Sequence, residues 1–237
     1  MSDQGILYIV ATPIGNLEDL ADRAKRVLGE VNVLACEDTR RTRILYEKFG
    51  ISSPGKIISY REQNEKTAGP GIVKLLMEGQ NVALCSDAGY PALSDPGYRL
   101  IRDAIEEGIK IVVIPGAGAI ETAVVVSGLP TDSFIFMGFP PKKPGQLRNM
   151  LAGVKELPNT LVFFESPLRV GKLLVAGYEV LGDRRVAVCI ELTKVFEEID
   201  RGWLSEMSGE YESKKIKGEV TVVIAGNNRK FIRSDPE

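Results

Sequence analysis

The stretch GIKIVVIPGAGAIET, residues 108–122, carries the pattern that decides the fold. It opens on Gly108, and glycine is favoured just past the end of a helix because it tolerates the left-handed conformation. The apolar run KIVVIP follows, and a run that is apolar on both faces is typical of an inner parallel strand covered by helices on each side. The turn-rich segment PGAGA then interrupts the pattern, so we place a domain boundary close to Ala119.

The same alternation of strand and helix continues on both sides of this stretch. Helix-length segments before it end at Gly29, Gly50 and Gly79, and the next strand follows each glycine within a few residues. The β-branched runs are GILYIVA, VNVLACE, KIISY and NVALCS before residue 108, and SFIFMGF, NTLVFF, RRVAVCIEL and EVTVVIAG after residue 122. This rhythm predicts βαβ units and a mostly parallel sheet.

We therefore expect a layered α/β protein with two α/β domains. The 237 residues are enough for two modest domains. We expect the first domain over residues 1–118 and the second over residues 119–226. Residues 227–237 are polar and basic, which predicts a flexible tail.

Composition limits the class of protein. Hydrophobic residues make up 44% of the chain and charged residues 26%, a balance typical of a protein that buries a core. No apolar stretch approaches the length of a membrane span, and the first residues lack the pattern of a signal peptide. We expect a cytoplasmic protein with no membrane contact. The net charge of −2 argues against indiscriminate binding of nucleic acid.

The sequence contains no histidine. This excludes a Ser-His-Asp triad, a histidine acid/base catalyst and the usual zinc sites. Cys36, Cys85 and Cys189 each lie in an apolar run without CxxC spacing, so we expect buried, inert thiols and no metal site. Carboxylates, lysines, tyrosines or a bound cofactor are left to carry any chemistry.

Five loops rich in turn-forming residues follow the predicted strands of the first domain. They read ATPIGNLEDL, CEDTRRTR, YREQN, CSDAGYPALSDPG and PGAGA. Turns need such residues for backbone geometry alone, but ligands of open α/β sheets bind beyond the carboxyl ends of strands. Five loops of this kind favour a ligand-lined cleft.

The residues of these loops limit the classes of ligand that they could bind. None of them matches GxGxxG or GxxxxGK[ST], so neither NAD nor ATP is indicated. The turns expose backbone amide and carbonyl groups at Asp87, Ala88, Gly89, Pro115 and Gly116. Such groups suit an adenosine and an amino-acid moiety.

Seven motifs occur in the order seen in one family of enzymes. They are TPIGNLED (12–19), EDTR (37–40), SDAGYPALSDPG (86–97), SGLPTDSFIFMGF (127–139), FESPLR (164–169), ELTK (191–194) and KGE (217–219). The chain resembles, over nearly its whole length, the ribosomal-RNA-modifying branch of the tetrapyrrole methylases. TPIGNLED and EDTR distinguish this branch from relatives that modify tetrapyrroles.

The resemblance implies a fold, a cofactor and partners. It implies two α/β domains with S-adenosylmethionine folded in the cleft between them, and a homodimer. It also implies methylation of a cytidine ribose 2′-hydroxyl in small-subunit ribosomal RNA, with the RNA or the small subunit as partner. The implied cofactor-binding residues are Ser86, Asp87, Ala88, Gly89, Pro91, Pro115, Gly116, Ala119, Met137, Gly138, Leu192 and Gly218.

The TPIGNLED and EDTR segments face RNA in this resemblance, which makes Asn16, Arg40, Arg41 and Arg43 the candidate RNA-binding residues. The three arginines crowd one loop after the run VNVLACE, where guanidinium groups can engage phosphates. A solvated charged face is the alternative explanation of such a cluster.

Methyl transfer to a hydroxyl needs a group that takes the hydroxyl proton. The candidates are Glu37, Asp38, Asp19, Glu165 and Lys194. Four of these candidates have a structural explanation as an alternative. Glu37 and Asp38 sit where a helix begins and can cap it, Glu165 can pair with Arg169 at helical spacing, and Lys194 can contact phosphate only.

The chain departs from the family pattern at several positions. Family members carry a histidine in the segment written here REQN (61–64), and YESPHR in place of FESPLR. PGPSA becomes PGAGA, and GTP becomes Gly89-Tyr90-Pro91. The loss of both histidines implies either that neither is the obligatory base or that the activity is altered. A methyltransferase of a small macrocycle and a non-catalytic S-adenosylmethionine-binding module remain the alternative functions.

Overall fold

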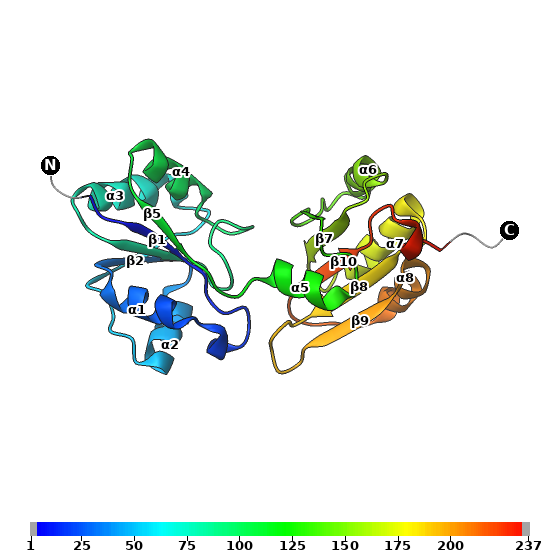
Figure 1. Cartoon of the computed structure of the whole chain (residues 1–237), viewed down its shortest axis with the longest axis horizontal. Coiled ribbons are helices and arrows are strands. Elements are labelled where there is room, and N and C mark those ends of the chain that lie inside the picture. The colour runs from blue at the N-terminus through cyan, green and yellow to red at the C-terminus, as the bar shows by residue number, and fades with distance from the viewer. Residues whose placement is uncertain (1–3, 234–237) are drawn as a thin grey trace. The chain divides into compact units, whose positions relative to one another are not determined.

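The computed structural model describes residues 4–233. The chain divides at Gly118 into two compact units, the second beginning at Ala119. Each unit is built on its own five-stranded sheet (Figure 1). The two units are described one after the other.

The first unit has a fully parallel sheet in the order β3-β2-β4-β1-β5. Its elements are β1 (Leu7–Val10), η1 (Leu17–Asp19), α1 (Asp22–Glu30), β2 (Val33–Cys36), α2 (Thr39–Phe49), β3 (Lys56–Ser59), α3 (Glu65–Met77), β4 (Val82–Cys85), α4 (Tyr98–Glu106) and β5 (Ile111–Ile114). Helices cover both faces, with α1 and α2 on one side and α3 and α4 on the other (Figure 1).

The alternation of side chains along the strands creates these two layers. In β1 and β2, Leu7, Ile9 and Val33 pack in the cluster that includes α3 and α4, whereas Val10 and Leu34 pack in the cluster with α1 and α2. Successive residues of a strand point to opposite faces, so a continuous apolar run fills both layers. The carboxyl ends of all five strands meet at one edge, because every pair is parallel.

Two expectations about this unit were wrong. The run KIVVIP was expected to be an inner strand, but β5 pairs only with β1 at the sheet edge, and Val113 is 51% exposed. Hydrophobicity alone does not distinguish an edge strand from an inner one. Gly29 lies inside α1 and does not end it, whereas Gly50 and Gly108 do follow helices with positive φ.

The second unit has a mixed sheet in the order β6-β7-β10-β8-β9. Its elements are α5 (Ala119–Ser127), β6 (Phe134–Phe136), α6 (Pro144–Val154), β7 (Thr160–Glu165), α7 (Val170–Leu181), β8 (Arg185–Ile190), β9 (Glu198–Trp203), α8 (Leu204–Ser213), β10 (Val220–Ile224) and η2 (Arg229–Phe231). Only β6 and β7 are parallel, and the other three pairs are antiparallel. The expectation of a mostly parallel sheet therefore holds for the first unit and fails here.

Helices cover both faces of this second sheet. One face packs against α6, α7 and α8 through residues such as Phe163, Val188 and Val222. Helix α5 contacts β8, β9 and β10. The strand β9 was not predicted, because its sequence EIDRGW is charged and gives no apolar run.

The predicted flexible tail is partly folded. Asn228 caps η2, and Ile232 forms a β-bridge with Arg184. The Arg233 amide donates to the Asp183 carbonyl at 2.9 Å. Residues 227–233 therefore belong to the second unit, and residues 234–237 lie outside the described residues.

The cysteines are free and buried, and Cys36 and Cys85 face each other in register on β2 and β4. Burial raises the pKa of all three thiols, which keeps them protonated and unreactive at neutral pH. Within residues 4–233, no cluster of three or more acidic or cysteine side chains can hold a metal ion. No helix in the same range is long and apolar enough to cross a membrane.

Candidate active site

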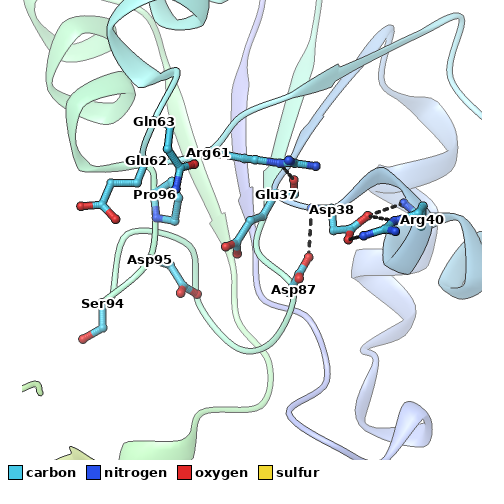
Figure 2. Close-up of a pocket in the computed structure, with 10 residues that line it drawn as sticks. All are labelled: Glu37, Asp38, Arg40, Arg61, Glu62, Gln63, Asp87, Ser94, Asp95 and Pro96. Atoms are coloured by element: carbon cyan, nitrogen blue, oxygen red, sulfur yellow. Dashed lines mark hydrogen bonds and ion pairs between the residues drawn. The ribbon is translucent and has the colours of Figure 1, made fainter.

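A cavity of about 360 Å³ opens at the strand ends of the first unit. It lies beyond β2, β3 and β4, which are neighbours in the sheet. This edge is where open α/β sheets bind ligands. The lining residues are Glu37, Asp38, Arg40, Arg61, Glu62, Gln63, Asp87, Ser94, Asp95 and Pro96 (Figure 2).

Glu37 is the first residue after β2, and its half-buried side chain points into this cavity (Figure 2). Burial raises the pKa of its carboxyl group, and the negative charge of Asp87 raises it further. The charges of Arg41 and Arg61 act in the opposite direction. A carboxylate with a raised pKa is a better proton acceptor than an ordinary one, provided that it is deprotonated at the working pH.

Asp38 has a structural task at the same strand end. It is the N-cap of α2, and its carboxylate accepts hydrogen bonds from the Arg40 amide at 2.9 Å and the Arg40 guanidinium at 2.6 Å. These hydrogen bonds hold the pKa of Asp38 well below its usual range. Asp38 is therefore a weak base, and the capping alternative describes it best.

Asp87, which follows β4, ties two strand ends together. Its carboxylate accepts a hydrogen bond from the Asp38 amide at 3.0 Å and lies 3.5 Å from Nε of Arg41. The carboxylate therefore faces the Glu37–Asp38 corner of the cavity. Asp87 was predicted to bind cofactor, and the cavity places it beside the candidate base.

The segment after β3 was expected to line a cleft, but none of its residues was among the predicted site residues. Nε of Arg61 donates to the Glu37 carbonyl at 2.9 Å, and the Arg61 amide donates to the Asn64 side chain at 2.7 Å. Glu62 and Gln63 line the cavity beside Arg61. Their position directly after a strand was the signal that could have identified them.

The loop of residues 90–97 forms the other wall of the cavity with Ser94, Asp95 and Pro96. Ala92 and Ser94 have φ of 70° and 64°, in the left-handed region that non-glycine residues rarely adopt. Such conformations persist only where the surrounding structure imposes them, and they cluster at functional sites. The Gly97 amide donates to the Glu65 carboxylate at 2.8 Å, which anchors the end of this loop to α3.

The predicted cofactor loops of the first unit lie together. Gly89 has φ of 73° and exchanges backbone hydrogen bonds with Thr12 at 2.9 and 3.0 Å. The Gly116 amide donates to the Tyr90 hydroxyl at 3.2 Å. A Cβ at Gly116 would lie 3.1 Å from Cβ of Ala11, so a side chain there would require Ala11 to shift. Ser86 closes the turn by donating to the Gly89 carbonyl at 3.3 Å.

The predicted cofactor residues of the second unit lie in three loop segments and one helix. The Gly138 carbonyl, which follows Met137, accepts from the Phe164 amide at 3.0 Å. Leu192 is buried, and Gly218 has φ of 85° with its Cβ position 2.2 Å from the Glu191 side chain. Ala119 is the first residue of α5.

Comparison with known proteins decides the family. The model of the tetrapyrrole (corrin/porphyrin) methylases matches residues 6–208. The chain is 48% identical, over 96% of its length and 78% of the relative's, to the "Ribosomal RNA small subunit methyltransferase I" of Halalkalibacterium halodurans. The protein of the same name from Thermotoga maritima is 45% identical over 94% of this chain and 99% of its own.

The chain belongs to the tetrapyrrole methylase family. It is a methyltransferase, and its identity to these relatives places it in their branch of the family. Solved tetrapyrrole methylases share its fold. The methyltransferase CobJ has a TM-score of 0.68 at 16% identity, covering 94% of this chain and 95% of its own. Uroporphyrin-III-C-methyltransferase from Thermus thermophilus has a TM-score of 0.62 at 20% identity. The match covers 93% of this chain and 94% of its own.

Glu165 of this methylase forms an ion pair with Arg169, and burial raises the pKa of its carboxyl group. Its side chain is 1% exposed, accepts from the Ser166 amide at 2.8 Å and lies 3.3 Å from the Arg169 guanidinium. Arg169 also donates to the carbonyls of Pro140 and Pro141. The buried pair braces the segment that follows Gly138, so the structural alternative describes Glu165 best.

Lys194 of the methylase is held by two carboxylates. Its ammonium group donates to Glu191 at 2.6 Å and to Glu219 at 3.1 Å. Burial opposes the charged form, but these hydrogen bonds outweigh it and raise the pKa of Lys194. A lysine that stays protonated cannot accept the proton of a substrate hydroxyl. Lys194 therefore fits a cationic contact better than a base.

The remaining predicted residues lie on the surface of the first unit. Asp19 is an exposed residue of η1, and the cavity lining does not include it. Asn16 caps η1 by accepting from the Glu18 amide at 3.0 Å. Arg40, Arg41 and Arg43 are exposed, and they lie in the first two turns of α2, not in a loop as expected.

Proposed function

We propose that this methylase transfers a methyl group from S-adenosylmethionine to the 2′-hydroxyl of a cytidine ribose in small-subunit ribosomal RNA. One observation carries the proposal. A half-buried glutamate with a raised pKa, Glu37, points into a cavity whose rim carries arginines of α2. The names of the relatives, which identify them as ribosomal RNA small subunit methyltransferases, support the substrate.

The residues of the first unit fit the methyl donor. The loops at Gly89 and Gly116 have no side chain at these positions, which lets an adenosine approach the backbone closely. S-adenosylmethionine, when bound, supplies an electrophilic methyl group. The residues proposed to contact it are Ser86, Asp87, Ala88, Gly89, Pro91, Pro115 and Gly116, with Ala119, Met137, Gly138, Leu192 and Gly218 of the second unit.

Glu37 is the proposed general base. Methyl transfer to a hydroxyl is an in-line displacement, so the main demand on the protein is to position the hydroxyl and receive its proton. The Glu37 carboxylate faces the cavity and keeps a raised pKa even with a hydrogen bond from the Asp87 backbone, whereas the Asp38 carboxylate is bound to Arg40 and has a lowered pKa. The Arg61 guanidinium donates a hydrogen bond to the Glu37 carbonyl and so holds the Glu37 backbone in place. This division of tasks needs no histidine.

The arginines of α2 are proposed to bind RNA phosphates. Cations in the first turn of a helix are disfavoured by the helix dipole, so helix stability does not explain Arg40 and Arg41. Both are paired to acids at the cavity, Arg40 to Asp38 at 2.6 Å and Arg41 to Asp87 at 3.5 Å. Arg43 extends the exposed basic face.

We further propose that the protein acts as a homodimer in the cytoplasm on the small subunit or its RNA.

The test replaces Arg40, Arg41 and Arg43 by alanine together. Methylation of small subunits should weaken and lose part of its salt dependence, because fewer phosphates are neutralised, while affinity for S-adenosylmethionine stays unchanged. The matched control replaces Lys74, Arg102 and Lys110, three exposed cations of the same unit outside the cavity lining. Equal loss of cofactor binding in the arginine variant would make these arginines structural. Unchanged RNA methylation would remove their proposed role.

A further inference from the structure

A second basic surface lies in the second unit, outside the proposed active site. Its centre is Trp203, the last residue of β9 and the single tryptophan of the chain. The guanidinium carbons of Arg185 and Arg233 lie 4.2 and 4.4 Å from the centre of the indole ring. Arg229 and Lys230 of η2 are exposed on the segment that leads to Arg233. We call these five residues the Trp203 surface.

A buried arginine holds the surface in place. Arg184 is 2% exposed, and its guanidinium donates to the carbonyls of Leu181, Lys155 and Ala225 at 3.1, 2.6 and 3.3 Å. The backbone of Arg184 also forms the β-bridge with Ile232. The backbone segment that carries Arg229, Lys230 and Arg233 is therefore fixed beside β8.

The charges of this surface are poorly balanced. Arg233 pairs with Glu206 at 2.9 Å and lies 3.8 Å from Asp183. Asp183 is 8% exposed, and its carboxylate already accepts hydrogen bonds from the Ser205 amide and hydroxyl. Arg185, Arg229 and Lys230 form no ion pair with any residue in the range 4–233. The surface therefore keeps an excess of positive charge.

Stacking on the indole prepares two of these cations for a polyanion. A guanidinium held over an aromatic ring can still donate its N–H groups to phosphate oxygens, and of the two it is Arg185 that forms no ion pair within residues 4–233. Two guanidinium groups against one ring also repel each other, and a bound phosphate relieves that repulsion. Several cations in a row match the spaced phosphates of a nucleic acid better than a single small anion.

We propose that the Trp203 surface is a second RNA contact, which binds phosphates of the substrate RNA away from the nucleotide that is methylated. The inference rests on the proposed function, because it takes the substrate to be RNA. It assigns to the second unit a part in substrate affinity that the motifs of the family do not include. It predicts no part in the chemical step.

The test replaces Arg185, Arg229 and Lys230 by alanine and retains Arg233 and Trp203. Binding of small-subunit RNA should weaken, and the slope of log affinity against log salt should fall by about 2 to 3, since each cation accounts for roughly 0.9 of that slope. In methylation of small subunits, KM should rise about tenfold or more while kcat stays unchanged. The control replaces Lys142, Lys172 and Lys215, three exposed lysines of the same unit.

Trp203 gives a second readout that does not depend on activity. Because it is the single tryptophan, RNA bound at this surface should change the emission of the parent protein, saturably and less at high salt. RNA affinity, salt slope and KM equal to the parent's in the triple variant would overturn the inference, even with active enzyme. A parent that methylates no RNA would instead overturn the proposed function, so the two failures are distinguishable.

Discussion

At the scale of single residues, the environments of neighbouring carboxylates separate their roles. Asp38 and Glu37 are adjacent in sequence, yet the pKa of Asp38 is lowered by Arg40 and that of Glu37 is raised by burial. The motif EDTR named both as candidates and could not separate them. Their difference depends on which carboxylate the helix start uses as a cap, and this is a property of the folded backbone.

The first prediction concerns Glu37→Gln. The substitution keeps the size of the side chain and removes its ability to take a proton, so kcat should fall by about 10²- to 10⁴-fold. Affinity for S-adenosylmethionine should not change. In the parent, the acid limb of the kcat/KM profile should lie above pH 4.5, the ordinary pKa of a glutamate, because the pKa of Glu37 is raised. Steady-state kinetics across pH decide this, and an active variant with the parent's profile contradicts it.

Glu37→Gln should also stabilise the fold at neutral pH. The folded protein binds the Glu37 proton more tightly than the unfolded chain, so stability falls as pH rises from the unfolded pKa to the folded one. Above that interval the ionised carboxylate costs free energy, and solvent screening at this partly exposed site keeps the cost small. Thermal unfolding of both proteins at pH 4 and pH 8 measures the effect. A variant less stable than the parent at pH 8 would contradict the assignment.

Tyr90 tests the cofactor loops with a small change. Its hydroxyl accepts the Gly116 amide at 3.2 Å and joins the two loops that were predicted to bind S-adenosylmethionine. Tyr90→Phe should weaken cofactor affinity about 2- to 10-fold, the value of one neutral hydrogen bond. Calorimetric titration measures this, with Tyr98→Phe, an exposed tyrosine of the same unit, as control. Equal affinity in the parent and Tyr90→Phe would show that this link does not shape the site.

At the scale of elements, the wall of the cavity depends on a contact that no motif shows. The loop of residues 90–97 contains Ala92, Ser94 and Gly97 with positive φ, and the Glu65 carboxylate of α3 accepts the Gly97 amide. A side chain at Gly97 would lie 3.0 Å from Leu84. The turn residues of SDAGYPALSDPG indicated a loop, but the residue that holds it lies on another helix and could not be predicted.

Glu65→Ala should remove the hydrogen bond that anchors the loop of residues 90–97 to α3. The variant should lose about 1–3 kcal/mol of stability from the unsatisfied amide, and methylation should lose kcat while cofactor affinity is kept. Glu65→Gln can still accept the Gly97 amide, so it should restore kcat. This rescue separates positioning of the wall from a simple loss of stability. Equal kcat in Glu65→Ala and the parent, measured well below the unfolding temperature, would contradict the role.

The strands also show how much of the fold the sequence patterns could predict. The apolar runs located nine of the strands, but β9 escaped because its residues are charged, and β5 was placed inside the sheet although it lies at the edge. Strand direction was correct in the first unit and wrong in most of the second. Some of the antiparallel pairs there join strands far apart in sequence, such as β7 and β10, and no local pattern encodes such a pair.

At the scale of the whole molecule, the strand-end rule predicted where the cavity lies, and the family motifs supplied the proposal for its chemistry. The loops after β2, β3 and β4 were expected to line a cleft, and all three contribute to the cavity. Arg61 and Asp95 were missed because the resemblance, and not the strand ends alone, chose the individual residues. The proposed division of labour places the base and one RNA contact in the first unit, and a second RNA contact in the second unit.

The most direct test of the central claim maps the methylated nucleotide. Purified protein is incubated with labelled S-adenosylmethionine and small subunits that lack the modification, and the labelled nucleotides are located. We predict label on one cytidine ribose, incorporated far more slowly by Glu37→Gln and at the parent's rate by the Lys74, Arg102 and Lys110 control. Label on a base, or no labelled RNA alongside methylation of a small macrocycle, would contradict the account.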